Sequence, residues 1–489
     1  MTSARTKTGL AYTAIFLFGG VIALLVTELA GLSRVELSPW HSLRLGKLQR
    51  TCVGGQVSTF SAWQECEEKL ITRSGEMLAE AVEHWPALSR FDPASPTYDR
   101  QFTPDWNHTV ELVPPRPVGG AVLLHGLSDS PYSLRAVALR LHDLGFHVVA
   151  PRLPGHGLFP GALNDARWQH WHKVTALSAR HLRESLGEDA PVIMVGYSNG
   201  AALAMDHALS AIEHPDAPDY VLPDRMVFLS PALAVTRFAR LGAAMETLAR
   251  LPGLEGLAWN SVVPEFDPVK YNSFPVRAGY EIEVLLDHVE RRLARFYEDG
   301  RLDALPPVLT LQSVVDDTVP PGPSLHRLYD RVHDERSELV LFDTNRETRV
   351  EGFLTPQGDH LAQLFSPDAV RDFSVTLVTN RKGPDGAMRE VEAVTRSAGQ
   401  SQTTRSPLGL VWPDNIYSLS HVAVPFPPDD PVYGDDASDG LRMGGLAVKG
   451  ERGALQVPAD LLARLRYNPF HDYLEQRLEA FVQPLIADQ

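Results

Sequence analysis

The chain has 489 residues, of which 44% are hydrophobic and 22% are charged, so it is long enough for one large globular domain or for two to three smaller ones. Its formal net charge is −16, and no block of lysines and arginines follows the N-terminus. This charge balance argues against nucleic acid and against anionic lipid headgroups as main partners.

An uncharged apolar segment lies near the start of the chain, at Gly9–Thr27, and is about long enough to cross a bilayer. Arg5 and Lys7 precede it and Glu28 follows, so the positive-inside rule places the N-terminus in the cytoplasm. No convincing A-x-A site follows, which favours an uncleaved signal anchor over a cleaved signal peptide. We therefore predict a membrane anchor over residues 1–33. The protein is then single-pass in the cytoplasmic (inner) membrane, with its remaining residues outside the cytoplasm, in the periplasm if the cell is Gram-negative.

The sequence has two cysteines, Cys52 and Cys66, both just beyond the predicted anchor. In an oxidising compartment, two nearby cysteines without other partners are expected to form a disulfide. Two free thiols are the alternative, and a metal site is disfavoured because no histidine lies between them. Residues 34–107 are predicted to be a helical segment and a linker, with an amphipathic helix over about Ser58–Leu88 and a linker rich in Pro, Asp and Thr over Asp92–Asn107.

From His108 onward, short apolar runs alternate with helical stretches for more than two hundred residues. This alternation predicts a mostly parallel sheet with helices on both faces, within one α/β domain over residues 108–489. The predicted strands are His108–Val113, Gly120–Leu124, His147–Ala150, Val192–Val195, Met226–Leu229, Val308–Leu311 and Leu339–Phe342.

The fourth of these runs leads directly into Gly196-Tyr197-Ser198-Asn199-Gly200, and small, helix-favouring residues follow. A strand that turns sharply into a helix forces the residue at the apex into a strained backbone conformation, and glycines two positions away leave room for the turn. Such a turn holds a serine hydroxyl above the sheet, at the positive end of a helix. We therefore predict that Ser198 is a nucleophile.

Two further motifs follow strands: His125-Gly126-Leu127 ends the second run, and PRLPGHG at residues 151–157 follows the third. Together with the Ser198 motif, they resemble the α/β-hydrolase superfamily, in its monoacylglycerol-lipase and carboxylesterase-like branch, which is similar to the S33 serine aminopeptidases. The resemblance implies an α/β-hydrolase fold. It also implies an oxyanion hole formed by the backbone N–H groups of Leu127 and Asn199. We expect His156, in the second motif, to be structural or to line the rim of the site.

The resemblance also assigns a cap and a catalytic acid. Residues 233–303 are predicted to form a largely helical cap over the active site, with a loop at Glu265–Pro275, and its apolar clusters suit an acyl chain. After the strand that begins at Val308, the branch carries its triad acid in a D-x-x-V pattern, which fits Asp316. The adjacent Asp317 is the alternative, although a turn residue is expected there.

The triad histidine is harder to place, because an insertion over residues 345–415 departs from the family pattern. Its runs Phe373–Val378 and Glu390–Ala393 predict a hairpin. His360 precedes these runs and His421 follows them. Because a small apolar residue and a final helix follow His421, as in the family, we predict that His421 is the general base. For this loop to return above the nucleophile, the hairpin must fold away from the carboxyl edge of the sheet.

These residues predict a serine hydrolase that cleaves carboxylic esters, lipid-like or with small acyl groups, through an acyl-enzyme on Ser198. The alternatives are an acyltransferase with the same triad and a catalytically inactive α/β-hydrolase that acts as a scaffold. The expected partners are an ester with an apolar acyl group and, through the N-terminal helix, a membrane. No cofactor, metal site or nucleic-acid partner is predicted.

Overall fold

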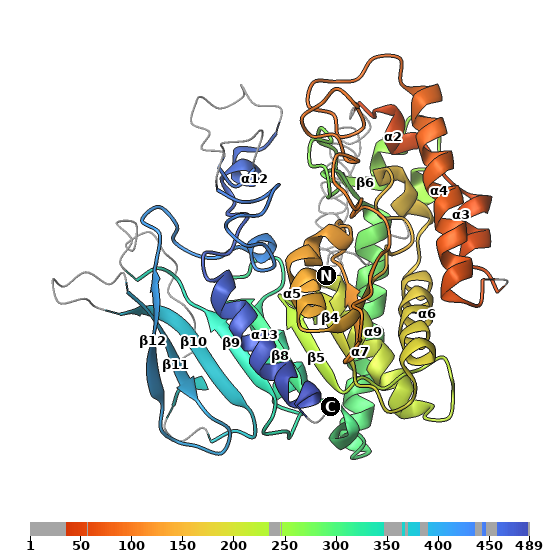
Figure 1. Ribbon diagram of the computed structural model, residues 1–489. Coiled ribbons are helices and arrows are strands. Elements are labelled where there is room, and N and C mark those ends of the chain that lie inside the picture. Colours follow the sequence, from red (N-terminus) through yellow and green to blue (C-terminus); the bar gives the residue numbers. More distant parts are fainter. Residues whose placement is uncertain are drawn as a thin grey trace, which may run out of the picture.

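A computed structural model describes residues 36–55, 57–233, 245, 247–346, 364–366, 370–381, 390–435, 443–445 and 457–487 (Figure 1). The predicted membrane anchor and His360 lie outside the described residues. Within the described ranges, no helix has the length and apolar character needed to cross a membrane.

The centre of the fold is a ten-stranded sheet in the order β1-β3-β2-β4-β5-β8-β9-β10-β11-β12. The strands from β3 to β10 pair in parallel, whereas β1, β11 and β12 are antiparallel to their neighbours. This confirms the predicted α/β-hydrolase fold with a mostly parallel sheet. The strands of this sheet are β1 (Val110–Leu112), β2 (Gly119–Leu124), β3 (Phe146–Ala150), β4 (Val192–Tyr197), β5 (Arg225–Leu229), β8 (Val308–Ser313), β9 (Glu338–Phe342), β10 (Ser374–Arg381), β11 (Glu390–Arg396) and β12 (Thr404–Val411).

Helices cover both faces of the sheet, as Figure 1 shows. Residues of α6 and α7 pack on one face, and residues of α5 and α13 pack on the other. The α-helices are α2 (Pro39–Ser42), α3 (Lys47–Cys52), α4 (Phe60–Ala81), α5 (Arg135–Asp143), α6 (Trp168–Leu186), α7 (Asn199–Glu213), α9 (Val276–Glu298), α10 (Pro321–Ser324), α12 (Ala459–Ala463) and α13 (His471–Ile486). Shorter helical turns are η1 (Pro131–Leu134), η2 (Pro160–Asp165), η4 (Glu255–Ala258), η5 (Leu302–Ala304), η6 (Leu325–Tyr329) and η8 (His421–Ala423).

The central strands are mostly apolar because both of their faces are buried. On β4, Val192 and Met194 belong to the hydrophobic core beneath α6 and α7, whereas Ile193 and Val195 belong to the core on the α5 and α13 side. This is the two-residue alternation of a strand. It explains why the sequence showed continuous apolar runs at these strands.

The N-terminal helices pack against the hydrolase core. Figure 1 shows α3 and α4 beside α6, at the opposite end of the molecule from β12. Cys52 and Cys66 form a disulfide that joins α3 to α4, with a Cα–Cα distance of 5.5 Å. Glu67 on α4 accepts hydrogen bonds from Arg152 Nε at 2.7 Å and from the Thr109 N–H at 3.1 Å, and the Arg152 side chain is fully buried. Because breaking a buried ion pair is costly, this contact fixes α4 to the loop after β3.

The prediction of a largely helical cap is only partly correct. The long helix α9 is present and packs on α6 and α7. Residues 251–264, however, are mostly turns, and the predicted loop Glu265–Pro275 is present. A small two-stranded sheet of β6 (Trp259–Ser261) and β7 (Phe274–Pro275) connects the two stretches. Polar side chains hold the predicted loop in its turns. Glu265 accepts from the N–H groups of Asn272 and Ser273, and the Asn272 side-chain oxygen accepts from the N–H groups of residues 266 and 267.

The predicted hairpin in the insertion is present as β10 and β11, and it joins the side of the sheet beyond β9 rather than its carboxyl edge. It extends the sheet, because β10 pairs in parallel with β9, and an unpredicted third strand, β12, pairs with β11. The sequence of β12 gave little signal since most of its side chains are exposed and it contains Pro407 and Gly409.

Candidate active site

Ser198 lies at the sharp turn between β4 and α7. Its φ of +52° lies in the left-handed region, which residues other than glycine rarely adopt. A Cβ at Gly200 would lie 1.8 Å from the Leu124 carbonyl oxygen, and one at Gly196 would lie 2.4 Å from the Ala201 nitrogen. The two glycines are therefore required for close packing of α7 on the sheet. The Ser198 N–H donates to the Leu229 carbonyl at 3.0 Å, which fixes the turn to the neighbouring strand.

Asp316 and His421 meet beside this turn. His421 Nδ1 lies 2.8 Å from Asp316 Oδ2, and both side chains are buried. The other carboxylate oxygen, Oδ1, accepts hydrogen bonds from the N–H groups of Thr318 at 3.0 Å and Val319 at 2.8 Å. These donors fix the carboxylate, so it can hold the imidazole in one orientation and stabilise the imidazolium form. Asp317 is exposed.

The three added strands explain how a histidine so far along the chain reaches this place. Strand β10 runs parallel to β9, and the chain then reverses twice, so β12 ends at the same edge of the sheet as β8 and β9. The segment after β12 is bound to that edge: Thr344 forms a bridge with Ser418, and Ser313 Oγ donates to the Leu419 carbonyl at 2.8 Å. His421 then begins η8, next to the carboxyl end of β8.

Leu127 and Asn199 line the same pocket as Ser198. Asn199 is the first residue of α7, and the N–H groups of a helix's first turn have no partner within the helix. The Leu127 carbonyl lies 2.6 Å from His156 Nε2, which fixes the loop on the other side of the serine. Both predicted oxyanion residues therefore border the nucleophile on rigid backbone.

Two buried histidines, His125 and His156, contact the backbone of the loop that carries Leu127. Burial lowers the pKa of His156 to about 4 and that of His125 well below its usual range. His125 Nε2 accepts from the Leu153 N–H at 3.0 Å, and its Nδ1 lies 2.9 Å from the Gly126 carbonyl. The structural role expected for His156 agrees with its position, because its contacts are to backbone carbonyls.

The pocket has a volume of about 500 Å³ and contains Ser198 and His421 in its wall. One part of the wall is apolar and comes from the cap, and another part is polar and charged. The apolar cap residues are Met245, Phe274, Val276 and Ile282, and the polar side chains include Asp129, Asn260, Lys270, Asn272 and Arg464. Lys270 Nζ lies 3.2 Å from Asp129 Oδ1, so these two charges largely offset each other.

Tyr271 joins the cap to the active-site loops. Its N–H donates to the Ser128 carbonyl at 2.8 Å, and its hydroxyl donates to the Gly155 carbonyl at 3.0 Å and accepts from the Leu158 N–H at 2.8 Å. The cap loop is thus connected both to the Leu127 loop and to the loop that carries His156. Arg152, which lies in that second loop, connects it further to α4.

A family model described as "Alpha/beta hydrolase family" matches residues 121–373, more than half of the chain. The chain belongs to the alpha/beta hydrolase family. A thermostable monoacylglycerol lipase from Bacillus sp. (strain H-257) is 24% identical over 222 residues, which cover 45% of this chain and 79% of the lipase. These matches confirm the predicted resemblance to the monoacylglycerol-lipase and esterase branch.

Solved structures of lipolytic enzymes resemble this hydrolase over about half of its length. The monoacylglycerol lipase of Paleococcus ferrophilus shares 22% identity, with a TM-score of 0.35, over 48% of this chain and 88% of that one. One structure from a study of the metagenome-derived lipolytic enzymes LipS and LipT also shares 22% identity, with a TM-score of 0.37, over 48% and 87%. These likenesses say nothing about the substrate of this α/β-hydrolase.

Sequence reasoning placed five residues of this hydrolase at one site, and the structure brings all five together: Ser198, Asp316, His421, Leu127 and Asn199. It missed the polar wall of the pocket. Lys270 and Tyr271 lie in a loop whose sequence suggests only a connection, and Arg464 lies just after the short helix α12. No sequence motif marks these residues, because their place in the wall depends on how the cap folds.

Proposed function

We propose that this α/β-hydrolase is a serine hydrolase that cleaves carboxylic esters carrying an apolar acyl group, through an acyl-enzyme on Ser198. The observation that best supports the proposal is the 2.8 Å contact of Asp316 with His421, because His421 lines the same pocket as the strained Ser198 turn. Strain of this kind persists where the surrounding structure fixes it, and it is common at active sites.

In the proposed reaction, His421 Nε2 takes the proton of the Ser198 hydroxyl as the oxygen attacks the ester carbonyl. Asp316 holds the imidazole by Nδ1 and stabilises its charged form without taking the proton. The N–H groups of Leu127 and Asn199 bind the oxyanion of the tetrahedral intermediate. The protonated imidazole then protonates the leaving alcohol, and a water molecule, activated by the same histidine, releases the acid and restores the serine.

The pocket wall supports an ester with one apolar side. Met245, Phe274 and Ile282 offer an apolar surface to the acyl chain, and burial of each methylene group there is worth about 0.8 kcal/mol. The polar wall, with Lys270 and Arg464, suits the alcohol part of the ester. Hydrolysis of p-nitrophenyl esters of graded acyl length measures this: kcat/KM should rise with chain length until the apolar wall is filled.

A fluorophosphonate probe tests the nucleophile directly. We expect it to label the purified protein at one site and to abolish ester hydrolysis, and we expect Ser198→Ala to prevent labelling. Ser230→Ala is a matched control, because Ser230 also follows a central strand with a positive φ of 43° but does not line the pocket. Labelling of Ser198→Ala at the parent rate would refute the proposal. A labelled protein that transfers its acyl group to added alcohols faster than to water would be an acyltransferase with the same triad.

We further propose that residues 9–27 anchor the protein in the cytoplasmic membrane, with the hydrolase domain outside the cytoplasm. The Cys52–Cys66 disulfide supports this location, since disulfides persist in oxidising compartments. A reporter fused after Leu32 should be active only in an extracytoplasmic assay. Recovery of the full chain from the cytosol with both thiols reduced would contradict the location.

A further inference from the structure

Three metal-ligating side chains converge outside the active site. Glu111 Oε1 lies 2.8 Å from His147 Nε2 and 2.7 Å from His181 Nε2, and the three ligand atoms lie within 4.8 Å of one another. None of the three residues lines the pocket that contains Ser198. Their separation along the chain hides them from any motif, so sequence analysis did not identify a metal site.

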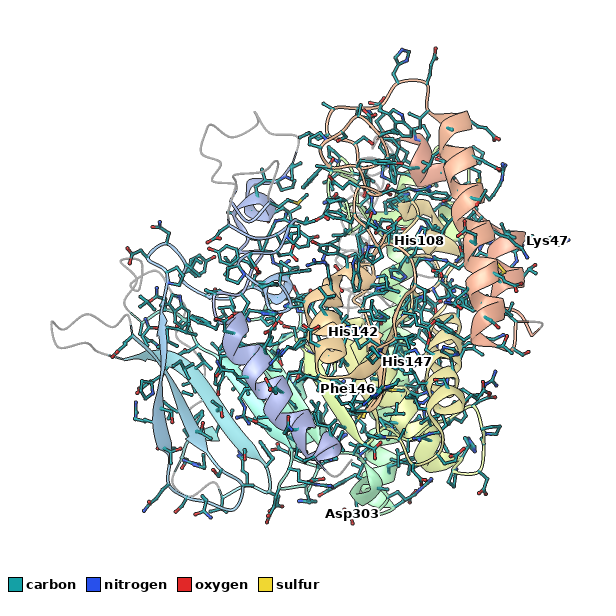
Figure 2. The ribbon with its side chains drawn as sticks, in the orientation of Figure 1. Lys47, His108, His142, Phe146, His147 and Asp303 are labelled. Carbon is teal, nitrogen blue, oxygen red and sulfur yellow. A yellow bond between two sulfur atoms is a disulfide. The ribbon has the colours of Figure 1, made fainter. Side chains whose placement is uncertain are left out.

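The topology explains why they meet. In the antiparallel pair of β1 and β3, Glu111 lies opposite Val149, and His147 is two residues from Val149, so both side chains are on the same face of the sheet. Helix α6 covers this face and contributes His181. Figure 2 labels His147, which lies beside this helix. The cluster thus joins the edge strand β1 to β3 and to α6.

The surroundings orient the two imidazoles. The His181 ring is stacked on Phe60 of α4, with ring centroids 4.6 Å apart. Ser185 Oγ, one turn after His181, donates to the Leu182 carbonyl and lies 3.5 Å from His147 Nδ1, so its lone pair faces that nitrogen. A histidine that binds a metal through Nε2 usually donates its other N–H to a neighbouring oxygen. At His147, Nε2 faces Glu111, and Nδ1 is placed to donate to Ser185 Oγ in the same way.

We propose that Glu111, His147 and His181 bind a divalent transition-metal ion, with Zn²⁺ as the best match and a water molecule as the fourth ligand. Two imidazoles and a carboxylate with an open position form a common tetrahedral zinc ligand set. The side chains of Glu111 and His181 are 25% and 30% exposed, so ion and water can reach the site from solvent. The ion would replace the two hydrogen bonds with coordinate bonds.

Binding requires a small local adjustment. Zn–N and Zn–O bonds of about 2.0–2.2 Å place tetrahedral ligand atoms roughly 3.3 Å apart. The Glu111 carboxylate must therefore withdraw by about 0.5 Å from each ring, and the Nε2 atoms of His147 and His181, which lie within 4.8 Å of each other, must come to the same spacing. Glu111 is partly exposed and lies on an edge strand, where its side chain has room to move. A second histidine–carboxylate cluster, around Asp206, has the Arg292 guanidinium against the carboxylate, and this positive charge disfavours a cation there. Among the described residues, Glu111 forms ion pairs with its two histidines and with no lysine or arginine.

The test is titration of the full, chelator-treated protein with Zn²⁺, followed by calorimetry and by equilibrium dialysis. We expect one Zn²⁺ per chain and a melting temperature that rises with Zn²⁺ concentration, because the ion binds only the folded site. Co²⁺ in the same site should give the visible absorption of tetrahedral coordination. Ester hydrolysis is not needed as a readout, so the result is independent of the proposed function.

Two variants separate a metal site from a simple hydrogen-bonded cluster. His181→Ala and Glu111→Gln each remove one ligand, and we expect the affinity for Zn²⁺ to fall more than about 100-fold, since loss of an outer partner alone costs about 10–100-fold. His333→Ala is the matched control, because His333 forms an exposed pair with Asp372 at 2.7 Å, and it should bind Zn²⁺ like the parent. Circular dichroism checks that each variant is folded. Absence of stoichiometric binding in the parent, or unchanged affinity in both ligand variants, would overturn the proposal and leave hydrogen bonding as the role of the cluster.

Discussion

Two regions of the molecule hold a histidine against a carboxylate at the same distance, 2.8 Å, with different surroundings. At the active site, Asp316 holds one histidine, and two backbone N–H groups occupy its second oxygen. At the edge of the sheet, a single oxygen of Glu111 faces two histidines. The Asp316 carboxylate can orient His421 as a base beside a nucleophile. At Glu111, the carboxylate oxygen and the two imidazole nitrogens instead direct several lone pairs toward one point. The contact distance alone therefore does not define the chemistry of a histidine–carboxylate pair.

Removing the histidine of the active-site pair should have the largest effect. We expect His421→Ala to lower kcat/KM for ester hydrolysis by about 10⁴- to 10⁶-fold, as Ser198→Ala should, and the double variant should be no worse because the two residues act as one unit. His326→Ala is the control, because His326 is exposed and lies 2.8 Å from the Asp330 carboxylate. Steady-state kinetics compares these four variants with the parent.

The same experiment addresses the alternative base. His360 lies outside the described residues, and His360→Ala should retain most of the activity if His421 is the base. An inactive His360→Ala protein together with an active His421→Ala protein would transfer the role to His360. It would also reduce the Asp316–His421 pair to a structural contact.

Changing the Asp316 carboxylate to an amide tests the role of the two N–H groups that bind its Oδ1. In Asp316→Asn, the N–H groups of Thr318 and Val319 should keep the amide oxygen at the Oδ1 position, so that the NH₂ group faces His421 Nδ1. The imidazole is then forced into the wrong tautomer, and kcat should fall about 10⁴-fold with little change in thermal unfolding.

Asp317→Asn is the matched control for this change, because Asp317 is adjacent and exposed. Its kcat should stay within about 2-fold of the parent, as surface substitutions away from special features usually have small effects. If Asp317→Asn rather than Asp316→Asn removed activity, the acid would be Asp317.

These two regions also show what the sequence can predict. Ser198 and its two glycines were predictable because the strained turn, the apolar strand and the helix all lie within about twenty consecutive residues. His421 was predictable as a candidate, but the reason it reaches the site was not. We expected the inserted hairpin to leave the carboxyl edge of the sheet, but not that β10, β11 and β12 would extend the sheet and so return the chain to that edge.

Contacts between distant segments were not predictable. The Glu111 cluster depends on the register of β1 against β3 and on the packing of α6, and the individual residues have no distinctive neighbours in sequence. The buried Glu67–Arg152 pair likewise depends on where α4 lies. The loop Glu265–Pro275 in the cap was predictable, but the side-chain hydrogen bonds of Glu265 that hold it were not.

His41 is a third kind of histidine, because it is buried without a carboxylate partner. It can be compared with the other two kinds through its effect on the pH dependence of stability. His41 Nδ1 accepts from the Ser38 N–H at 3.0 Å. Its Nε2 lies 2.9 Å from Ser273 Oγ, whose hydroxyl donates to the Val263 carbonyl. Only the neutral ring with a proton on Nε2 satisfies these contacts. Burial accordingly lowers the pKa of His41 to about 4, below the value of 6.5 expected in the unfolded chain.

Because its folded-state pKa is the lower one, His41 contributes stability that is present above about pH 6.5 and is lost as the pH falls toward 4. Between pH 7 and pH 5, this residue should reduce the free energy of unfolding by about 2 kcal/mol, since each unit of pKa difference corresponds to about 1.4 kcal/mol. His41→Gln should lose this part of the pH dependence, whatever its effect on stability at pH 7. The exposed His326→Gln should retain it. Urea unfolding of each protein at pH 7 and pH 5 measures the change in the free energy of unfolding. If this change is the same in the parent and in His41→Gln, His41 is not held neutral by its contacts.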